Sequence, residues 1–327
     1  MTTRRTRTAA PAAALAAALL LALAGCSSDG DDGAGPAPDT VTAAPTGTGP
    51  GSASGSASAS PASPAPSSPS PGGSSPAPGG SATGGTAGSH PPPAQARWQP
   101  RPGTAWQWQL DGRVDTGVDV PVYDIDGFEN DAATVARLHA QGRKVICYVN
   151  VGAYEDYRSD AKDFPAAVRG EGNGWKGEAS LDVRRTDVLL PLMARRFDMC
   201  RAKGFDAVEP DLVENYHADT GFRISAADQL AYNRAIAKLA HDRGLAVGLK
   251  NDLDQIPALV GDFDFAVNEQ CAEFGECDAL KPFLAAGKAV FHVEYTTPND
   301  RYCARSRQLG LSSMTKHLEL DAWRKPC

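Results

Sequence analysis

Apolar residues recur between residues 98 and 327 as short runs, and each run is followed by a more polar stretch. Runs of this length that lie between turn residues are typical of buried β-strands. The eight runs that we expect to form strands are Trp106–Leu110, Val120–Ile125, Lys144–Val149, Phe205–Glu209, Leu245–Leu249, Phe263–Val267, Ala289–Val293 and Leu311–Thr315.

Helical spacing fills most of the stretches between these runs. In Asp131–Gln141, for example, Val135 and Leu138 share one face of a helix, and Asp187–Ala202 and Ala226–Arg243 have comparable patterns. A glycine marks the helix ends shortly before the next strand, as is common at helix C-termini: Gly142, Gly204, Gly244, Gly287 and Gly310. This alternation predicts an α/β fold with a parallel sheet.

Eight strands in such an alternation predict a closed (β/α)8 TIM barrel. The other candidate is an open doubly wound sheet, but its usual glycine-rich phosphate turn is missing after the first strand. Only nine residues, Asp111–Asp119, separate the first two predicted strands. Because a crossover helix needs more chain than this, we expect the barrel to be slightly irregular between strands one and two.

The composition divides the chain into three parts. Residues 98–327 contain all five tryptophans and have the length of one α/β barrel, so we predict one catalytic domain there. Residues 27–97 consist almost entirely of Ser, Pro, Gly, Ala and Thr. Such a segment cannot bury enough apolar surface to offset its ordering entropy, so we predict a disordered linker.

The first residues have the pattern of a signal peptide. Arg4, Arg5 and Arg7 precede the apolar stretch Ala9–Ala24, and the pattern ends in Leu-Ala-Gly-Cys at Cys26. This ending resembles the bacterial lipobox, in which the cysteine is lipidated. We therefore expect residues 1–26 to direct export and Cys26 to anchor the chain at the extracellular face of the cell membrane. The alternative is an ordinary signal peptide with a coincidental cysteine.

Charge and cysteine content limit the possible partners. The formal net charge of −7 argues against nucleic acid and suits a cationic ligand. Six cysteines follow Cys26, and an exported chain meets an oxidising environment, so we expect disulfides. Fifteen pairings are possible, and proximity along the chain favours Cys271–Cys277 and Cys303–Cys327, which leaves Cys147–Cys200. The sequence lacks CxxC and His-x-His, so we expect no metal site. We also expect no cofactor and a monomer.

Acidic and other polar residues gather at the C-terminal ends of the predicted strands, where TIM barrels place their active sites. A single acid there can instead cap the next helix, and this alternative stays open for Asp126 and Asp252. The recurrence of acids on at least four strand ends indicates a site. Two buried carboxylates without a cluster of metal ligands point to glycoside hydrolysis. The strand-end residues are Asp124, Asp126, Tyr148, Asn150, Glu209, Asp211, Lys250, Asn251, Asp252, Asn268, Glu269, Glu294 and Tyr295.

Five of these strand-end segments together resemble glycoside hydrolase family 114, a family of endo-α-1,4-polygalactosaminidases with a (β/α)8 fold. The resemblance extends over about 98–327. The segments that carry it are Tyr-Asp-Ile-Asp-Gly-Phe at 123–128, Cys-Tyr-Val-Asn-Val-Gly at 147–152, Gly-Phe-Asp-Ala-Val-Glu-Pro-Asp at 204–211, Gly-Leu-Lys-Asn at 248–251 and Val-Asn-Glu-Gln-Cys at 267–271. The chain departs from the family pattern at Leu212, where asparagine is usual.

The resemblance implies roles for individual residues. Asp211 and Glu269 match the catalytic pair, and we expect a retaining mechanism with Asp211 as nucleophile and Glu269 as acid/base. The remaining pocket residues that we expect to bind substrate are Asp124, Tyr148, Glu209, Lys250, Asn251 and Glu294. The implied substrate is a cationic, α-1,4-linked galactosamine-rich exopolysaccharide that is cleaved internally. The alternatives are a weakly catalytic or non-catalytic carbohydrate-binding lipoprotein, and a hydrolase of another α-glycan.

Overall fold

The computed structural model describes residues 97–327. Eight parallel strands pair in a single order within one sheet, and a short antiparallel strand, β11 (Lys325–Pro326), extends it beyond β10. In the order of pairing, the parallel strands are β1 (Trp106–Gln109), β2 (Val122–Asp126), β3 (Lys144–Asn150), β6 (Ala207–Asp211), β7 (Ala246–Lys250), β8 (Phe265–Glu269), β9 (Val290–Glu294) and β10 (Ser312–Thr315).

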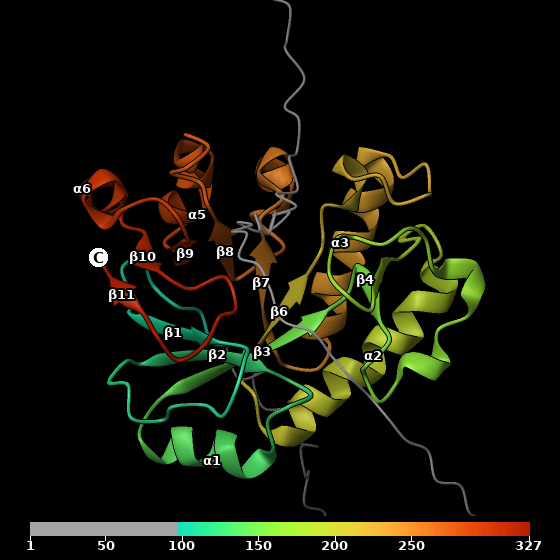
Figure 1. The fold of residues 1–327 in the computed structure, drawn as a ribbon, viewed down its shortest axis with the longest axis horizontal. Coiled ribbons are helices and arrows are strands. Elements are labelled where there is room, and N and C mark those ends of the chain that lie inside the picture. The colour runs from blue at the N-terminus through green and yellow to red at the C-terminus, as the bar shows by residue number, and fades with distance from the viewer. Residues whose placement is uncertain (1–96) are drawn as a thin grey trace, which may run out of the picture. The chain divides into compact units, whose positions relative to one another are not determined.

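Helices lie outside the ring of strands (Figure 1). They are α1 (Ala132–Ala140), α2 (Thr186–Lys203), α3 (Ala226–His241), α4 (Ile256–Leu259), α5 (Lys281–Ala285) and α6 (Asn299–Leu309). Short 3-10 helices occupy the loops at η1 (Ala161–Asp163), η2 (Ala166–Val168), η3 (Asn215–His217), η4 (Leu253–Gln255) and η5 (Cys277–Leu280). Between residues 97 and 327, none of the helices is sufficiently long and apolar to traverse a bilayer.

Successive side chains of a strand point to opposite faces of the sheet, and this alternation gives the barrel an inner and an outer core. Side chains from all eight parallel strands meet in one buried apolar cluster inside the ring: Trp106, Trp108, Val122, Ile146, Ala207, Ala246, Phe265, Val267, Phe291, Val293 and Met314. The intervening residues face the helices and belong to a second buried cluster. The expected (β/α)8 barrel is confirmed, and each predicted strand overlaps an observed one.

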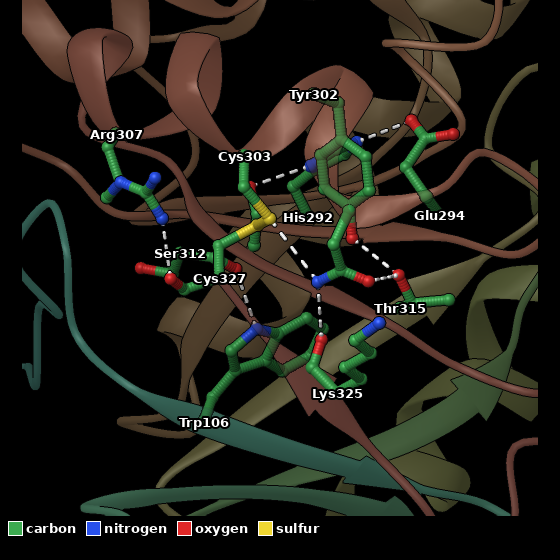
Figure 2. Close-up of a disulfide and its surroundings, with 12 residues drawn as sticks. Trp106, His292, Glu294, Tyr302, Cys303, Arg307, Ser312, Thr315, Lys325 and Cys327 are labelled. Carbon is green, nitrogen blue, oxygen red and sulfur yellow. Dashed lines mark hydrogen bonds and ion pairs between the residues drawn. A yellow bond between two sulfur atoms is a disulfide. The ribbon is translucent and has the colours of Figure 1, made fainter.

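The predicted irregularity is also present, because residues 110–121 between β1 and β2 contain no helix. The C-terminal segment lies close to β1 and β10 at this side of the barrel. The Trp106 indole donates to the Ser312 carbonyl at 2.8 Å (Figure 2). Arg324 donates to the Trp106 carbonyl at 2.9 Å. Hydrogen bonds from side chains therefore connect β1 with β10 and with the end of the chain.

Three disulfides join the cysteines in the predicted pairs. Cys147–Cys200 ties β3 to α2, and Cys271–Cys277 closes the loop after β8. Cys303–Cys327 holds the C-terminal residue against α6 (Figure 2). The signal peptide, the lipidated Cys26 and almost all of the linker were predicted for residues outside the described part of the chain.

The segment between β3 and α2 differs from the sequence prediction. It contains an antiparallel pair, β4 (Ala153–Glu155) and β5 (Glu178–Ser180), that is separate from the barrel sheet. Each of these strands is only three residues long, so neither produces an apolar run that a periodicity analysis can detect. This pair helps to form one wall of the site described next.

Candidate active site

Three neighbouring strands deliver one charged side chain each to the same end of the barrel. On β6, β7 and β8 the inward residues are Ala207, Ala246 and Phe265 in the lowest layer. Four residues further along the same faces stand Asp211, Lys250 and Glu269, at the C-terminal ends of their strands. The strand ends therefore bring the two predicted catalytic acids together on either side of a lysine.

Lys250 is the centre of this arrangement. Its ammonium lies 2.8 Å from Asp211 Oδ1, 3.1 Å from Glu269 Oε2 and 3.5 Å from Glu209 Oε1. It also lies 5.0 Å from the centre of the Trp108 ring. Burial alone would lower the pKa of Lys250, but the surrounding carboxylates raise it well above its usual value. The lysine is therefore a permanent positive charge between the two acids.

Asp211 is held in its ionised form. Its Oδ1 accepts from Lys250, and its Oδ2 accepts from the Tyr148 hydroxyl at 2.7 Å. Burial would raise the pKa of Asp211, but the Lys250 charge and these hydrogen bonds lower it below its ordinary value. Such a carboxylate is suited to act as a nucleophile or to stabilise positive charge.

Glu269 is oriented by contacts to both carboxylate oxygens. Tyr295 donates to Oε1, and Asn251 donates to Oε2 at 3.2 Å. The Asn251 side chain also accepts from the Glu269 backbone amide at 2.9 Å, which fixes the end of β8 relative to β7. Glu269 therefore has one preferred orientation toward Lys250.

Asp124 and Glu209 form a buried carboxyl pair beneath Lys250. Both side chains are inaccessible to solvent, and in the described structure no hydrogen-bond donor satisfies their oxygens. Burial raises the pKa of both, well above the ordinary value for Asp124 and to about 7 for Glu209. The negative charge of Glu209 raises the pKa of Asp124 further. Ionisation of Glu209 therefore disfavours ionisation of Asp124, and Glu209 faces Lys250 at 3.5 Å.

Glu294 has a different environment from the one that the sequence predicted. Phe291 and Val293 on β9 point into the barrel, so Glu294, one residue later, points away from it. Its Oε1 accepts from His292 Nε2 at 2.9 Å (Figure 2). The same oxygen accepts from the Ala272 amide at 2.8 Å. The strand period therefore places Glu294 outside the cavity, and the following residue, Tyr295, contacts Glu269 instead.

A cavity of about 460 Å³ opens above these residues. Five of the predicted site residues line it: Tyr148, Asp211, Lys250, Asn251 and Glu269. Other lining residues include Trp108, Tyr157, Trp175, Glu178, Glu214, Tyr295 and Leu318. Tyr157, Trp175 and Glu178 were not predicted because they lie in the β3–α2 segment, which carries no long strand or helix signal. Asp124, Glu209 and Glu294 are buried and are not among the lining residues.

The backbone is strained immediately after each of the three charged residues. Leu212, Asn251 and Gln270 follow Asp211, Lys250 and Glu269, and they have φ angles of 57°, 47° and 61°. This left-handed conformation costs energy for residues other than glycine, and it persists where the surrounding structure enforces it. This conformation turns the backbone sharply at the end of each of the three strands, directly after the charged residue.

Two strand-end carboxylates that face one cavity of a (β/α)8 barrel are the pair of groups that glycoside hydrolysis requires. The chain belongs to glycoside-hydrolase family GH114, which matches residues 88–327. It is similar to the crystal structure of Aspergillus fumigatus Ega3 in complex with galactosamine, with 38% sequence identity and a TM-score of 0.67. That match covers 71% of this chain and 98% of Ega3.

More distant relatives support the fold. The glycoside hydrolase domain of PelA from Pseudomonas aeruginosa is 16% identical, with a TM-score of 0.53, and the match covers 68% of this chain and 98% of that domain. A protein of Deinococcus radiodurans is 29% identical over 231 residues, which are 62% of this chain and 73% of the relative. The barrel fold is therefore shared with the bacterial PelA domain, and the class of glycoside hydrolase follows from the family match over residues 88–327.

Proposed function

We propose that the enzyme cleaves an α-1,4-linked, galactosamine-rich polysaccharide internally, with Asp211 and Glu269 as its catalytic pair. The observation that carries this proposal is the contact of both carboxylates with the single ammonium of Lys250. The sugar follows from Ega3, which is similar to this chain and has been solved with galactosamine. The substrate-binding roles of Tyr148 and Asn251 belong to the same proposal, because both residues line the cavity.

The geometry favours a retaining mechanism. The Asp211 and Glu269 oxygens lie 2.8 and 3.1 Å from the same nitrogen. These two oxygens can therefore be at most about 6 Å apart, and this upper limit supports carboxyl groups at the ~5–5.5 Å of retaining enzymes over the ~6.5–9.5 Å of inverting ones. In the proposed first step Asp211 attacks the anomeric carbon while Glu269 protonates the leaving oxygen. In the second step Glu269 removes a proton from water, which releases the sugar from Asp211.

Removal of either carboxylate tests the catalytic pair. Asp211→Asn and Glu269→Gln should each lower the release of reducing ends from a galactosamine polymer by roughly 10²–10⁴-fold, because the nucleophile or the acid/base is lost. Asp198→Asn, an exposed acid on α2, is the matched control. Circular dichroism should show that all three variants remain folded. Near-normal turnover by either site variant would remove that residue from the proposal.

The stereochemical outcome and the sugar need separate measurements. NMR during the first minutes of hydrolysis should show products with the α-configuration if the mechanism is retaining. A panel of exopolysaccharides, among them partly acetylated galactosamine polymers and neutral α-glycans, then identifies the substrate. Faster cleavage of a neutral α-glycan would contradict the galactosamine assignment without affecting the catalytic pair.

We also propose that the enzyme is an exported, monomeric lipoprotein. This proposal rests on the Leu-Ala-Gly-Cys sequence at Cys26 and on the three disulfides, which suit an oxidising compartment. Residues 27–97 would then act as a tether between lipid and enzyme. Stable attachment needs more than one acyl chain, which a diacylglyceryl group would supply. Cys26→Ala should abolish fractionation with the membrane, and a variant that still sediments with membranes would contradict lipidation.

A further inference from the structure

Two aromatic side chains of the β3–α2 segment lie open to solvent at the wall of the cavity. Trp175 is 59% exposed and Tyr157 is 56% exposed, although both belong to residue types that are usually well covered. Both line the same cavity as Asp211 and Glu269. Within residues 97–327, the other exposed tryptophan, Trp323, does not line this cavity.

The contacts around these aromatics fix them in place. The Trp175 amide donates to Asn173 Oδ1 at 3.1 Å, and the Trp175 carbonyl accepts from the Glu178 amide at 3.2 Å. This turn connects directly to β5, which pairs with β4. Because the backbone on both sides of Trp175 is bonded, its ring can bind a ligand without a large loss of backbone entropy.

Tyr157 packs against a network of buried ion pairs. The guanidinium of Arg158 lies 5.2 Å from the centre of the Tyr157 ring. It also bonds to Asp126 at 2.6 Å and to Glu155 at 2.9 Å, and all three charged side chains are buried. The ring is therefore attached to the barrel and not only to a surface loop.

Glu178 is bonded to Tyr157 through its side chain and to Trp175 through its backbone. Glu178 Oε1 accepts from the Tyr157 hydroxyl at 2.8 Å, and Oε2 accepts from Asn173 at 2.9 Å. These bonds hold the Glu178 carboxylate against Tyr157, in the wall of the cavity that Trp175 also lines. An apolar face next to a fixed carboxylate is the surface that a protonated aminosugar requires, because its ring C–H groups stack on aromatics and its ammonium pairs with an acid.

We infer that Trp175, Tyr157 and Glu178 form an accessory subsite that binds one protonated aminosugar unit of the polymer at a distance from the bond being cleaved. This inference rests on the proposed function, because the polymer must extend through the cavity. The β3–α2 segment follows β3, which is the neighbour of β6 and therefore of Asp211. The subsite thus extends the cavity on the Asp211 side of the barrel.

Such a subsite should affect long substrates only. Trp175→Ala should raise KM for a long deacetylated galactosamine polymer by about tenfold, which is the effect expected for loss of one stacking contact. It should also change the distribution of product lengths. The turnover of a short activated galactosaminide should stay the same, because that substrate fills only the region between Asp211 and Glu269. Trp323→Ala is the matched control and should behave as the unmodified enzyme on both substrates.

Glu178→Gln removes the negative charge at residue 178 and keeps the size and shape of its side chain. It should weaken cleavage of the deacetylated polymer and leave cleavage of an acetylated polymer unchanged, because acetylation removes the ammonium. If Trp175→Ala and Trp323→Ala have the same KM and product lengths on the polymer, the subsite does not exist, although the proposed function stands.

If the unmodified enzyme releases no reducing ends, the proposed function fails. The existence of the subsite is then tested by the binding of a galactosamine oligosaccharide. Isothermal titration calorimetry should show binding to the unmodified enzyme and to Trp323→Ala, and a loss of binding in Trp175→Ala. Equal binding by all three proteins, or binding by none of them, would overturn the inference.

Discussion

Buried Asp252 and half-buried Glu214 form a second carboxyl cluster next to the cavity. Asp252 accepts from the Tyr216 hydroxyl at 3.0 Å and from Asn233 at 2.8 Å, and its own amide donates to Glu214 at 3.0 Å. Burial raises the pKa of Asp252 to about 8 and that of Glu214 to about 7. In the folded chain both groups therefore keep a proton at pH values where the unfolded chain has released it.

This difference predicts how stability depends on pH. As pH rises from about 4 to about 8, the unfolded chain loses these protons first, so the free energy of unfolding should fall through this window. Each unit of pKa difference corresponds to ~1.4 kcal/mol, and we expect a total loss on the order of a few kcal/mol. Asp252→Asn should make this slope shallower, because an amide does not titrate, while Glu214, Glu209 and Asp124 keep their contributions. Asparagine also tolerates the left-handed φ of 46° at this position.

Urea unfolding at four pH values between 5 and 8 measures this slope. Asp254→Asn is the control, because Asp254 is an exposed neighbour with 79% of its side chain accessible. An unmodified enzyme whose stability rises between pH 5 and pH 8 would contradict the assignment of protonated Asp252 and Glu214.

The sequence allowed prediction of some of these residues and not of others. Asp211, Lys250 and Glu269 could be found because each ends an apolar run, and parallel strands end at the same side of a barrel. Glu294 ends a run in the same way, but a shift of one residue turns its side chain outward. The predicted ends of strands are uncertain by more than one residue. The sequence alone therefore cannot show whether the side chain of a strand-end residue points into the barrel or away from it.

At the scale of elements, the loop after β3 packs directly against the end of β6. The Val151 and Gly152 amides both donate to the Asp211 carbonyl, at 3.1 and 3.2 Å. A Cβ atom at Gly152 would lie 1.7 Å from the Leu212 carbonyl oxygen. Only glycine permits this close approach of two backbones, and the approach fixes the position of Asp211.

Gly152→Ala should therefore separate β6 from the loop. We expect a loss of stability of about 1–3 kcal/mol from overpacking, measured by urea unfolding, together with lower activity because Asp211 moves. Gly261→Ala is the control, since a Cβ atom there meets nothing within 4 Å and its φ is not left-handed. If both variants unfold at the same urea concentration, the contact between these elements is not as close as the structure indicates.

Long elements were predictable, and short ones were not. The eight barrel strands and the helices α1, α2 and α3 agree with the apolar patterns to within about two residues. All five glycines expected at helix ends have left-handed φ angles between 72° and 93°. The β4–β5 pair depends on contacts between residues about 25 positions apart. The local spacing of apolar residues carries no information about such contacts. For this reason the cavity wall that contains Trp175 could not be predicted.

At the scale of the whole molecule, negative charge is concentrated around the cavity. The chain carries a net charge of −7, and acids along the cavity outnumber the two basic residues, Arg158 and Lys250. Both basic groups are themselves bonded to carboxylates. The lining acids are Asp111, Asp126, Glu129, Glu155, Glu178, Asp211, Glu214, Glu269 and Glu319. Such a field should attract a polycation before any specific contact forms.

Salt should therefore weaken the enzyme on a charged polymer. Raising the ionic strength from about 10 mM to about 1 M shortens the screening length from ~30 to ~3 Å, and kcat/KM on a deacetylated galactosamine polymer should fall by roughly tenfold. The expected change lies mainly in KM, because the contacts of Asp211 and Glu269 within the site are shielded from salt. A fully acetylated polymer of the same length is neutral and serves as the control, with little change expected. Equal salt dependence for both polymers would mean that the acids around the cavity do not select the substrate by charge, and the preference for a cationic aminosugar would then have to come from direct contacts alone.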